Sequence, residues 1–405
     1  MYVYKRNSYA DSGGLLKSRA NRGGYMIYKP FCNTGIVFAD KKEMMERLLA
    51  LNAGNIVLVM SDSSASRWEM LSFIENLQHK CETLNSTFTW IKTVNANPTQ
   101  KDIINSLQQI GNKEVDLIIA LGGGSSIDLA KGISAFHSVG KNNFYTIDEI
   151  TNKIKQKNYI NNNFVDIIAL PSTSGTGSEL TQWATIWDEN KNGKYSLDAP
   201  GLKPKMAIIV PELTLSMPAE ITIATGLDAV CHAIESYWSK HTTPLVQEIA
   251  YRAVEIAIRN LRKAVESPGD IIVREKLCNA SMLAGLAFSQ TRTTACHSIS
   301  YPLTMLYGVP HGLAAAITLD AVGRVNKGHF KNDKELFALF NEYSGIKGWI
   351  DKVCEGVINM RLSAFGIIEK DVPRIVGKAF TGGRMDNNPV DLKKEDVSAI
   401  LGSVL

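Results

Sequence analysis

The sequence predicts an α/β domain with a parallel sheet, followed by a domain built only of helices. In the first half of the 405-residue chain, short apolar runs alternate with amphipathic helical patterns, which is typical of a parallel sheet covered by helices on both faces. From about Pro211 onward, strand-like runs nearly vanish and long helical patterns take over. We therefore expect a flexible extension over residues 1–24, an α/β domain over residues 25–212 and a helical domain over residues 213–405.

Five apolar runs of strand length form the predicted sheet. Residues 116–121 (DLIIAL) are the clearest of them, because they lead directly into three glycines. The other predicted strands are residues 55–61, 88–94, 165–170 and 206–210. Helical patterns lie between the first three strands, near residues 67–78 and over residues 101–110.

The second domain begins with three long helical patterns. They cover residues 219–240, 244–267 and 271–289, and several shorter patterns follow up to Leu405. The chain shows no internal repeat, so a repeat architecture is not predicted.

Composition and charge narrow the class of protein. The chain is 45% apolar and 21% charged, as in ordinary globular proteins. A net charge of +4 is too small to indicate binding of nucleic acid or of an anionic membrane, and no apolar run is long enough for a spanning helix. The N-terminus lacks the apolar stretch of a secretory signal, and none of the six cysteines forms a CxxC pair. We expect a cytoplasmic protein without a disulfide framework or a thiolate zinc site.

A glycine-rich loop, LGGGSSIDLAK (residues 121–131), follows the clearest strand and opens a helix. Glycine N–H groups can approach an anion closely, and the positive end of the helix dipole favours one. The loop is neither the usual dinucleotide fingerprint, because Ile127 stands where a third glycine would be, nor a Walker loop. It predicts either a phosphate-binding turn or a tight turn that binds nothing. The residues concerned are Gly122, Gly123, Gly124, Ser125 and Ser126.

A second loop, PSTSGTGSE (residues 171–179), also follows an apolar strand and is dense in hydroxyl groups and glycine. This composition suits contacts to a ribose or a phosphate, and a flexible loop is the alternative. Both loops lie at the carboxyl ends of predicted strands, where ligands bind in open α/β sheets. Asp62 ends the first predicted strand and can accept hydrogen bonds from an adenine ribose, although its position alone is that of an ordinary turn residue.

The helical half carries a cluster of candidate metal ligands. Asp228 and His232 are four residues apart in a helical pattern, which places both side chains on one face, one turn apart. His297 and His311 follow later in the chain. Two prolines between these histidines prevent one continuous helix, so a helix–loop–helix must bring the two imidazoles together. These prolines are Pro302 and Pro310.

A divalent metal explains these four side chains better than separate structural roles do. Three of the chain's seven histidines lie in apolar, helical surroundings, and each needs a partner if it is buried. One such histidine is usually a satisfied core residue, whereas three of them with an aspartate at ligand spacing indicate a metal site. Imidazole and carboxylate together suit Fe²⁺, Zn²⁺ or Mn²⁺.

Together these motifs resemble the iron-containing (group III) alcohol dehydrogenases. The resemblance is carried by GGGSSID, PSTSGTGSE, Lys194 within GKYSLDAPGLKPKMAIIVP, TGLDAVCHAIE, and HSISYP with PHG, and it runs from about residue 27 to the C-terminus. It implies a fold like that of dehydroquinate synthase, with a dinucleotide-binding domain, a helical domain and one divalent metal, first of all Fe²⁺, in the cleft between them. It also implies a homodimer. The implied metal ligands are Asp228, His232, His297 and His311.

The resemblance also implies a nicotinamide cofactor site. An acid at the position of Asp62 favours NAD(H) over NADP(H) in this family, because it contacts the ribose hydroxyl and would repel a 2′-phosphate. Asn97 and Ser172 are placed in the same cofactor set. The complete set is Asp62, Asn97, Gly122, Gly123, Gly124, Ser125, Ser126, Asp128, Ser172, Thr173, Thr176, Thr181 and Lys194.

The implied chemistry is hydride transfer to an aldehyde. The metal acts as a Lewis acid on the substrate oxygen, and the nicotinamide delivers hydride. Many family members carry a histidine four residues after the third ligand, often assigned to a proton relay, where this chain has Tyr301. The Tyr301 phenol can donate a proton in its place, and the ribose or a water is the alternative donor.

Arg292 indicates the class of substrate. The stretch SQTRTTACH places this arginine and two threonines shortly before His297. Arginine suits bidentate pairing with a sulfonate, phosphonate or carboxylate, whereas a surface or interhelical salt bridge is the alternative. RTTACHSISYP also looks like the branch that reduces short anionic aldehydes. We expect a small anionic aldehyde as substrate: sulfoacetaldehyde, reduced to isethionate with NADH, or next phosphonoacetaldehyde.

The sequence leaves three alternatives to the reduction of a short anionic aldehyde. A general short-chain alcohol dehydrogenase would use the same fold and mechanism. A sugar-phosphate lyase of the dehydroquinate synthase type would show a Glu/His/His metal set and a more basic cleft, and ranks low. A metal- or nucleotide-binding protein without catalysis is disfavoured by the complete ligand set and both cofactor loops.

Overall fold

The structure is a computed structural model that describes residues 31–138, 144–189 and 193–405. Residues Cys32–Leu405 form one compact unit, which contains all the described helices and strands. The extension expected over residues 1–24 lies outside the described residues.

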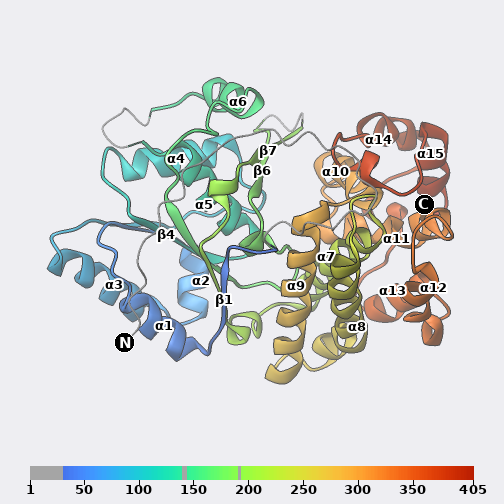
Figure 1. Cartoon of the computed structure of the whole chain (residues 1–405), viewed down its shortest axis with the longest axis horizontal. Helices are drawn as coiled ribbons and strands as arrows, with labels where there is room; N and C mark the ends of the chain where they lie inside the picture. The colour runs from blue at the N-terminus through green and yellow to red at the C-terminus, as the bar shows by residue number, and fades with distance from the viewer. Residues whose placement is uncertain (1–30, 139–143, 190–192) are drawn as a thin grey trace, which may run out of the picture. The chain divides into compact units, whose positions relative to one another are not determined.

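A six-stranded sheet occupies the N-terminal half of this unit (Figure 1). Its strands follow the order β1-β8-β5-β4-β2-β3, and every neighbouring pair is parallel, so the predicted parallel sheet is confirmed. β1 was not predicted, because it is a short edge strand whose residues are all at least partly exposed. The strands are β1 (Gly35–Phe38), β2 (Ile56–Val59), β3 (Phe88–Ile91), β4 (Leu117–Gly122), β5 (Asp166–Pro171) and β8 (Met206–Ile209).

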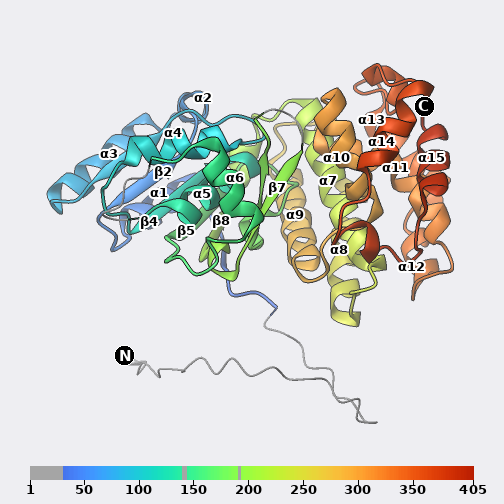
Figure 2. The ribbon, with the colours of Figure 1, turned by 90° about the horizontal axis from the view of Figure 1, so that it is seen from above.

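Helices cover both faces of the sheet, because strand residues alternate between two apolar clusters. Val57 and Ile118 pack with α4, α5 and α6, whereas Leu58 and Ile119 pack with α1, α2 and α3 on the other face. The two groups of helices can be followed in Figures 1 and 2. The helical pattern predicted near residues 67–78 corresponds to α3, and the short helix α2 before it was not predicted. The bounds are α1 (Lys41–Leu49), α2 (Asp62–Arg67), α3 (Leu71–Thr83), α4 (Gln100–Ile110), α5 (Gly124–Phe136) and α6 (Ile147–Lys155).

An antiparallel pair, β6 (Trp183–Trp187) and β7 (Lys194–Asp198), stands apart from the main sheet. It was not predicted, because both strands have only five residues and neither is a continuous apolar run. The backbone N–H of Trp187 donates to the carbonyl of Pro98 (2.8 Å), which ties the pair to the segment before α4. This pair positions Lys194 and Asp198 for the site described below.

The C-terminal half consists of helices, as predicted. Three long helices, α7 (Ala219–Trp238), α8 (Pro244–Glu266) and α9 (Ile271–Thr291), pack against one another and start where the sequence predicted them. None of the described helices is both long and apolar enough to cross a membrane. The remaining helices are α10 (Ala295–Tyr307), α11 (His311–Asn326), α12 (Asp333–Ala338), α13 (Ile346–Cys354), α14 (Val372–Lys378) and α15 (Lys394–Gly402).

The break between α10 and α11 corrects one detail of the sequence prediction. Pro302 does not end a helix but lies inside α10, whereas Gly308, Val309 and Pro310 form the break. Gly308 has a φ of 68°, a left-handed conformation that glycine adopts easily at the end of a helix. The predicted helix–loop–helix is present, but its loop comes later in the chain than Pro302 suggested.

Candidate active site

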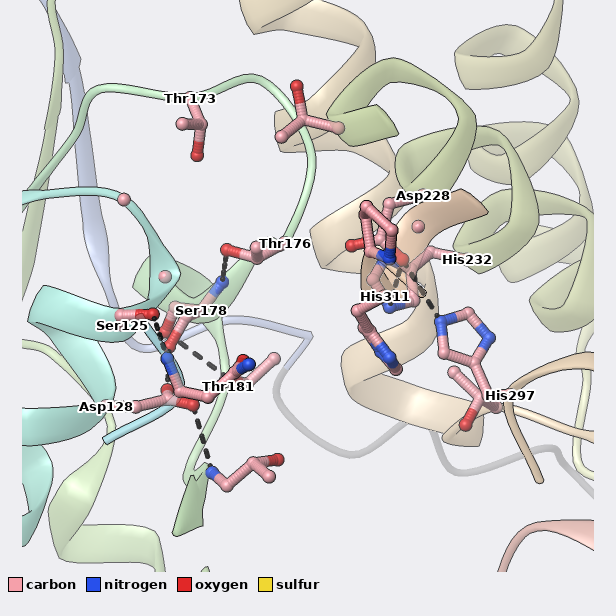
Figure 3. A pocket seen from close by; sticks show the side chains of 18 of the residues that line it. Ser125, Asp128, Thr173, Thr176, Ser178, Thr181, Asp228, His232, His297 and His311 are labelled. Carbon is pink, nitrogen blue, oxygen red and sulfur yellow. Dashed lines mark hydrogen bonds and ion pairs between the residues drawn. The ribbon is translucent and has the colours of Figure 1, made fainter. Parts of the chain in front are cut away.

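A pocket of about 490 Å³ lies between the sheet and the C-terminal helices (Figure 3). One wall is formed by the glycine loop after β4 and the hydroxyl-rich loop after β5, and the other by residues of α7, α9, α10 and α11. Figure 3 shows the serine and threonine side chains of the first wall facing Asp228 and the three histidines of the second. The two groups of residues singled out in the sequence therefore meet at one pocket.

The four predicted metal ligands converge on the helical wall. Asp228 and His232 lie on α7, His297 on α10, and His311 is the first residue of α11. Asp228 Oδ1 is 3.3 Å from His297 Nε2 and 4.0 Å from His232 Nε2. One potential ligand atom from each of Asp228, His297 and His311 lies within 4.8 Å of the others. The donor atoms of these three residues are thus close enough to share one ion, whereas His232 stands outside this group.

Hydrogen bonds fix which imidazole nitrogen faces the cluster. His232 Nδ1 lies 3.3 Å from the carbonyl oxygen of Gly175, to which it can donate. His297 Nδ1 forms a short hydrogen bond with the Glu235 carboxylate, which also accepts from the backbone N–H of Cys296 (2.8 Å). In both histidines Nε2 is therefore the atom directed at Asp228. Carboxylates and carbonyls orient metal-binding histidines in this way.

Glu235 was not predicted from the sequence. Its side chain is fully buried, and its other oxygen also accepts from Thr294 Oγ1 (2.8 Å), whose own oxygen accepts from Trp238 Nε1 (2.9 Å). A signal was available, because Glu235 stands seven residues after Asp228 and three after His232 on α7. That spacing puts all three side chains on one face of the helix.

The ionisation of these groups fits a cation site. Burial acts to raise the pKa of Asp228, but the three histidines outweigh it and hold the pKa well below its ordinary value. Burial lowers the pKa of His232 to about 4 and that of His311 to about 3, so both rings are neutral and can offer a lone pair. Burial also acts to lower the pKa of His297, but Glu235 and Asp228 raise it to about 10. A metal ion at Nε2 would take the place of the second ring proton, so this donor set fits a divalent ion.

Gly312 lets α11 approach α7 at the cluster. A Cβ atom at this position would lie 2.0 Å from the carbonyl oxygen of Ala224 and 2.8 Å from Cβ of Asp228. Such contacts do not occur between real atoms, so only glycine allows this separation. The glycine that follows His311 therefore brings that histidine next to Asp228.

The two loops of the opposite wall pack against each other through their glycines. A Cβ atom on Gly124 would lie 2.8 Å from the Thr176 side chain, and one on Gly123 would lie 3.5 Å from that of Thr173. All four residues line the pocket at the start of α5. Backbone N–H groups at a helix start, next to hydroxyl groups, suit the phosphates of a dinucleotide.

Eight of the thirteen predicted cofactor residues line the pocket: Asn97, Gly123, Gly124, Ser125, Asp128, Thr173, Thr176 and Thr181. Three others, Gly122, Ser126 and Ser172, form part of the support behind them. The Ser172 N–H donates to the Gly122 carbonyl (2.9 Å), and Ser126 lies against Gly122. Asp62 is exposed at the start of α2, outside the pocket lining. Lys194 is not a lining residue, but it contacts Tyr301, which is one.

The half-buried Asp128 and the fully buried Lys131 brace the second loop. Asp128 accepts hydrogen bonds from Ser178 Oγ (2.7 Å) and the Thr185 N–H (2.9 Å), so both its oxygens are engaged within the protein. Lys131 Nζ donates to the carbonyls of Ser178 (2.7 Å) and Trp183 (2.8 Å). Lys131 was not predicted as a site residue, although it belongs to the glycine-loop motif.

Tyr301 lies beside the histidine cluster. Its ring stacks on that of His311, with centroids 5.8 Å apart, and Lys194 Nζ lies 3.0 Å from its ring centroid. Burial acts to raise the pKa of Tyr301, but Lys194, Arg384 and His297 outweigh it and lower the pKa to about 7. The phenol is therefore acidic enough to exchange a proton near neutral pH.

Two arginines line the pocket near these residues. Arg292 directly follows α9 and forms a short ion pair with Asp198, and its guanidinium lies 5.5 Å from the ring centroid of Trp183. Arg384 was not predicted, because it lies in a loop far along the chain from the cluster. Only the fold brings it to the pocket.

Two sequence profiles match the chain. The profile of iron-containing alcohol dehydrogenases matches residues 34–211, and the profile of the C-terminal part of the Fe-containing alcohol dehydrogenase family matches residues 222–405. Together they cover the sheet and the helical half, including all four predicted ligands.

Known proteins agree with these profiles. A 1,3-propanediol dehydrogenase of Klebsiella pneumoniae is 30% identical over 324 residues (76% of this chain, 80% of the relative), and an NADPH-dependent butanol dehydrogenase of Clostridium saccharobutylicum is 29% identical over 390 residues (90% and 95%). The structure of a sulfoacetaldehyde reductase from Bifidobacterium kashiwanohense in complex with NAD⁺ superposes with a TM-score of 0.78 at 25% identity, covering 94% of this chain and 99% of that one. The chain therefore belongs to the iron-containing alcohol dehydrogenase family and is a nicotinamide-dependent alcohol dehydrogenase.

Proposed function

We propose that this enzyme reduces a short aldehyde that carries a strong anionic group, with NADH as the hydride donor. Sulfoacetaldehyde, reduced to isethionate, is the first candidate substrate, and phosphonoacetaldehyde is the second. The observation that carries the proposal is that two arginines, Arg292 and Arg384, line the same pocket as His297 and Tyr301. A guanidinium group next to a carbonyl-binding centre favours a substrate with an anion at its other end.

The protein residues divide the work of the reaction. Asp228, His232, His297 and His311 would hold a divalent ion, first of all Fe²⁺, that polarises the carbonyl oxygen, while the bound nicotinamide supplies hydride. Glu235 and the Gly175 carbonyl hold two of the imidazoles in place. Tyr301 delivers a proton to the substrate oxygen from its position against His311.

Asp62 supports the choice of NADH over NADPH. Its carboxylate is exposed directly after β2, at the carboxyl edge of the sheet from which the glycine loop also starts. A carboxylate there can accept a hydrogen bond from a ribose hydroxyl and repels a 2′-phosphate.

The test is NADH and NADPH oxidation at 340 nm with sulfoacetaldehyde, phosphonoacetaldehyde and propanal in parallel, on iron- and zinc-loaded enzyme. We expect a higher kcat/KM for one anionic aldehyde than for propanal, and higher rates with NADH than with NADPH. Equal kcat/KM values for propanal and both anions would contradict the proposal and leave a general short-chain alcohol dehydrogenase, the activity that the names of the butanol and propanediol relatives favour.

A further inference from the structure

The charge of Arg292 is already neutralised within the protein. Its guanidinium pairs with the Asp198 carboxylate from β7 and lies over the Trp183 ring from β6. About 40% of its side chain stays exposed. A guanidinium paired in this way offers an incoming anion little net charge, so Arg292 is better placed to hold β6 and β7 against α9 than to bind substrate.

Arg384 has the opposite character. It is 9% exposed and lines the pocket, yet within the described chain its side chain makes one hydrogen bond, from Nη1 to the carbonyl of the preceding residue, Gly383 (2.8 Å). Among the described residues no carboxylate forms an ion pair with it. A nearly buried guanidinium without an anionic partner is costly for the fold, and a bound anion would offset that cost.

The loop that carries Arg384 is fixed at the pocket. Asn387 Nδ2 donates to the carbonyls of Thr293 (3.1 Å) and Gly383 (2.9 Å), which joins the loop to the segment just before α10. A Cβ atom added to Gly383 would lie 3.4 Å from Arg292 Nη1. Arg292 therefore reaches the residue next to Arg384, and the two arginines lie on adjacent segments. Arg384 lines the same pocket as Tyr301.

We propose that Arg384, rather than Arg292, binds the anionic group of the substrate. This inference rests on the proposed reduction of an anionic aldehyde and names the residue that would select it. A sulfonate, phosphonate or carboxylate would pair with the free guanidinium edge while the aldehyde end reaches the histidine cluster. Arg292 acts as a positioning residue through Asp198 and Trp183.

The test compares Arg384→Gln, Arg384→Lys and Arg292→Gln in the metal-loaded enzyme, with Lys378→Gln as a control that removes one positive charge from the exposed end of α14. For Arg384→Gln we expect kcat/KM to fall about 10- to 100-fold more for the anionic aldehyde than for propanal, with partial recovery in Arg384→Lys. Arg292→Gln should lower both values by a similar factor. Ethanesulfonate, ethylphosphonate and propionate, titrated against the enzyme–NADH complex, show which anion binds and whether Arg384→Gln weakens it.

The outcomes separate this inference from the proposed function. If the wild type prefers an anionic aldehyde but Arg384→Gln lowers kcat/KM equally for anion and propanal, the role of Arg384 is refuted while the function stands. If only Arg292→Gln lowers kcat/KM more for the anionic aldehyde than for propanal, Arg292 and not Arg384 binds the anionic group. If the wild type shows no preference for any anion and none of the three analogues binds, the proposed function fails together with the inference. Weakened NADH binding in Arg384→Gln would instead place Arg384 in the cofactor site and also refute it.

Discussion

At the scale of single residues, we propose that Tyr301 donates the proton to the product. Its ring stacks on His311 and lies under Lys194 Nζ, so its phenol is held at the pocket wall by contacts on both sides. We expect Tyr301→Phe to lower kcat for aldehyde reduction at pH 7 by about 100-fold or more, which is the usual contribution of a positioned general acid. Tyr307→Phe, which removes a phenol from the same helix outside the pocket lining, is the matched control. Equal turnover of Tyr301→Phe and wild type would exclude Tyr301 from the proton transfer.

The buried carboxyl of Glu179 should make the stability of the folded protein depend on pH. Burial raises its pKa to about 7 from an ordinary value of 4.5, against the opposing effects of its own backbone N–H and of Lys131. A raised pKa means that the folded protein binds this proton more tightly than the unfolded chain. The stability due to Glu179 is therefore complete below pH 4.5 and is lost as the pH rises to about 7, by about 3 kcal/mol at most. In Glu179→Gln this loss is absent.

Urea denaturation at pH 4.5 and pH 8 measures the effect of Glu179. The free energy of unfolding of Glu179→Gln should improve relative to wild type as the pH rises. If the difference in the free energy of unfolding between wild type and Glu179→Gln is the same at both pH values, Glu179 has an ordinary pKa in the folded protein.

The sequence located the site residues that follow helical or loop motifs, and it missed those that depend on tertiary packing. Asp228 and His232 share a helix face by their spacing, and the glycine loop follows a strand, so both could be predicted. Arg384 could not, because nothing in its local sequence links it to residues almost ninety positions earlier. The partner of Arg292 was likewise hidden, since Asp198 lies on a strand that the sequence did not reveal.

At the scale of elements, the contact between α7 and α11 sets the geometry of the metal cluster. Gly312→Ala would place a methyl group 2.0 Å from a backbone oxygen of α7, so α11 must move away and carry His311 with it. We expect lower metal affinity, a large loss of activity and a destabilisation of about 1–3 kcal/mol. Gly377→Ala in α14, where nothing lies within 4 Å of the added carbon, is the control and should be neutral or slightly stabilising.

Metal content after dialysis and the unfolding midpoint in urea measure the Gly312→Ala effect. A variant with wild-type metal content and wild-type activity would show that the close approach of α11 is not needed to hold His311 in the cluster.

Element prediction succeeded where a pattern was continuous. The strands β2 and β4 are buried throughout, β5 is buried after its first residue, and the helices α7, α8 and α9 are longer than any strand, so each shows one clear pattern. β6 and β7 have only five residues each, without a continuous apolar run, and pair with each other away from the main sheet, so these strands could be recognised only once the fold placed them together. Pro302 misled the prediction because α10 continues through it.

At the scale of the whole molecule, the histidine cluster joins parts of the chain that are far apart in sequence. Three helices supply the ligands, and the Gly175 carbonyl, from the loop after β5, holds His232.

A metal bound by these residues stabilises the folded protein and not the unfolded chain, because the ligands come together only on folding. With the metal at about 1,000 times its dissociation constant, we expect about 4 kcal/mol of added stability and a clear rise in Tm. Differential scanning calorimetry of chelated enzyme, before and after addition of Fe²⁺ or Zn²⁺, measures it. His311→Ala should lose most of the rise, whereas His329→Ala, which removes an exposed imidazole outside the cluster, should keep it. An equal rise in His311→Ala and wild type would place the stabilising metal elsewhere in the molecule.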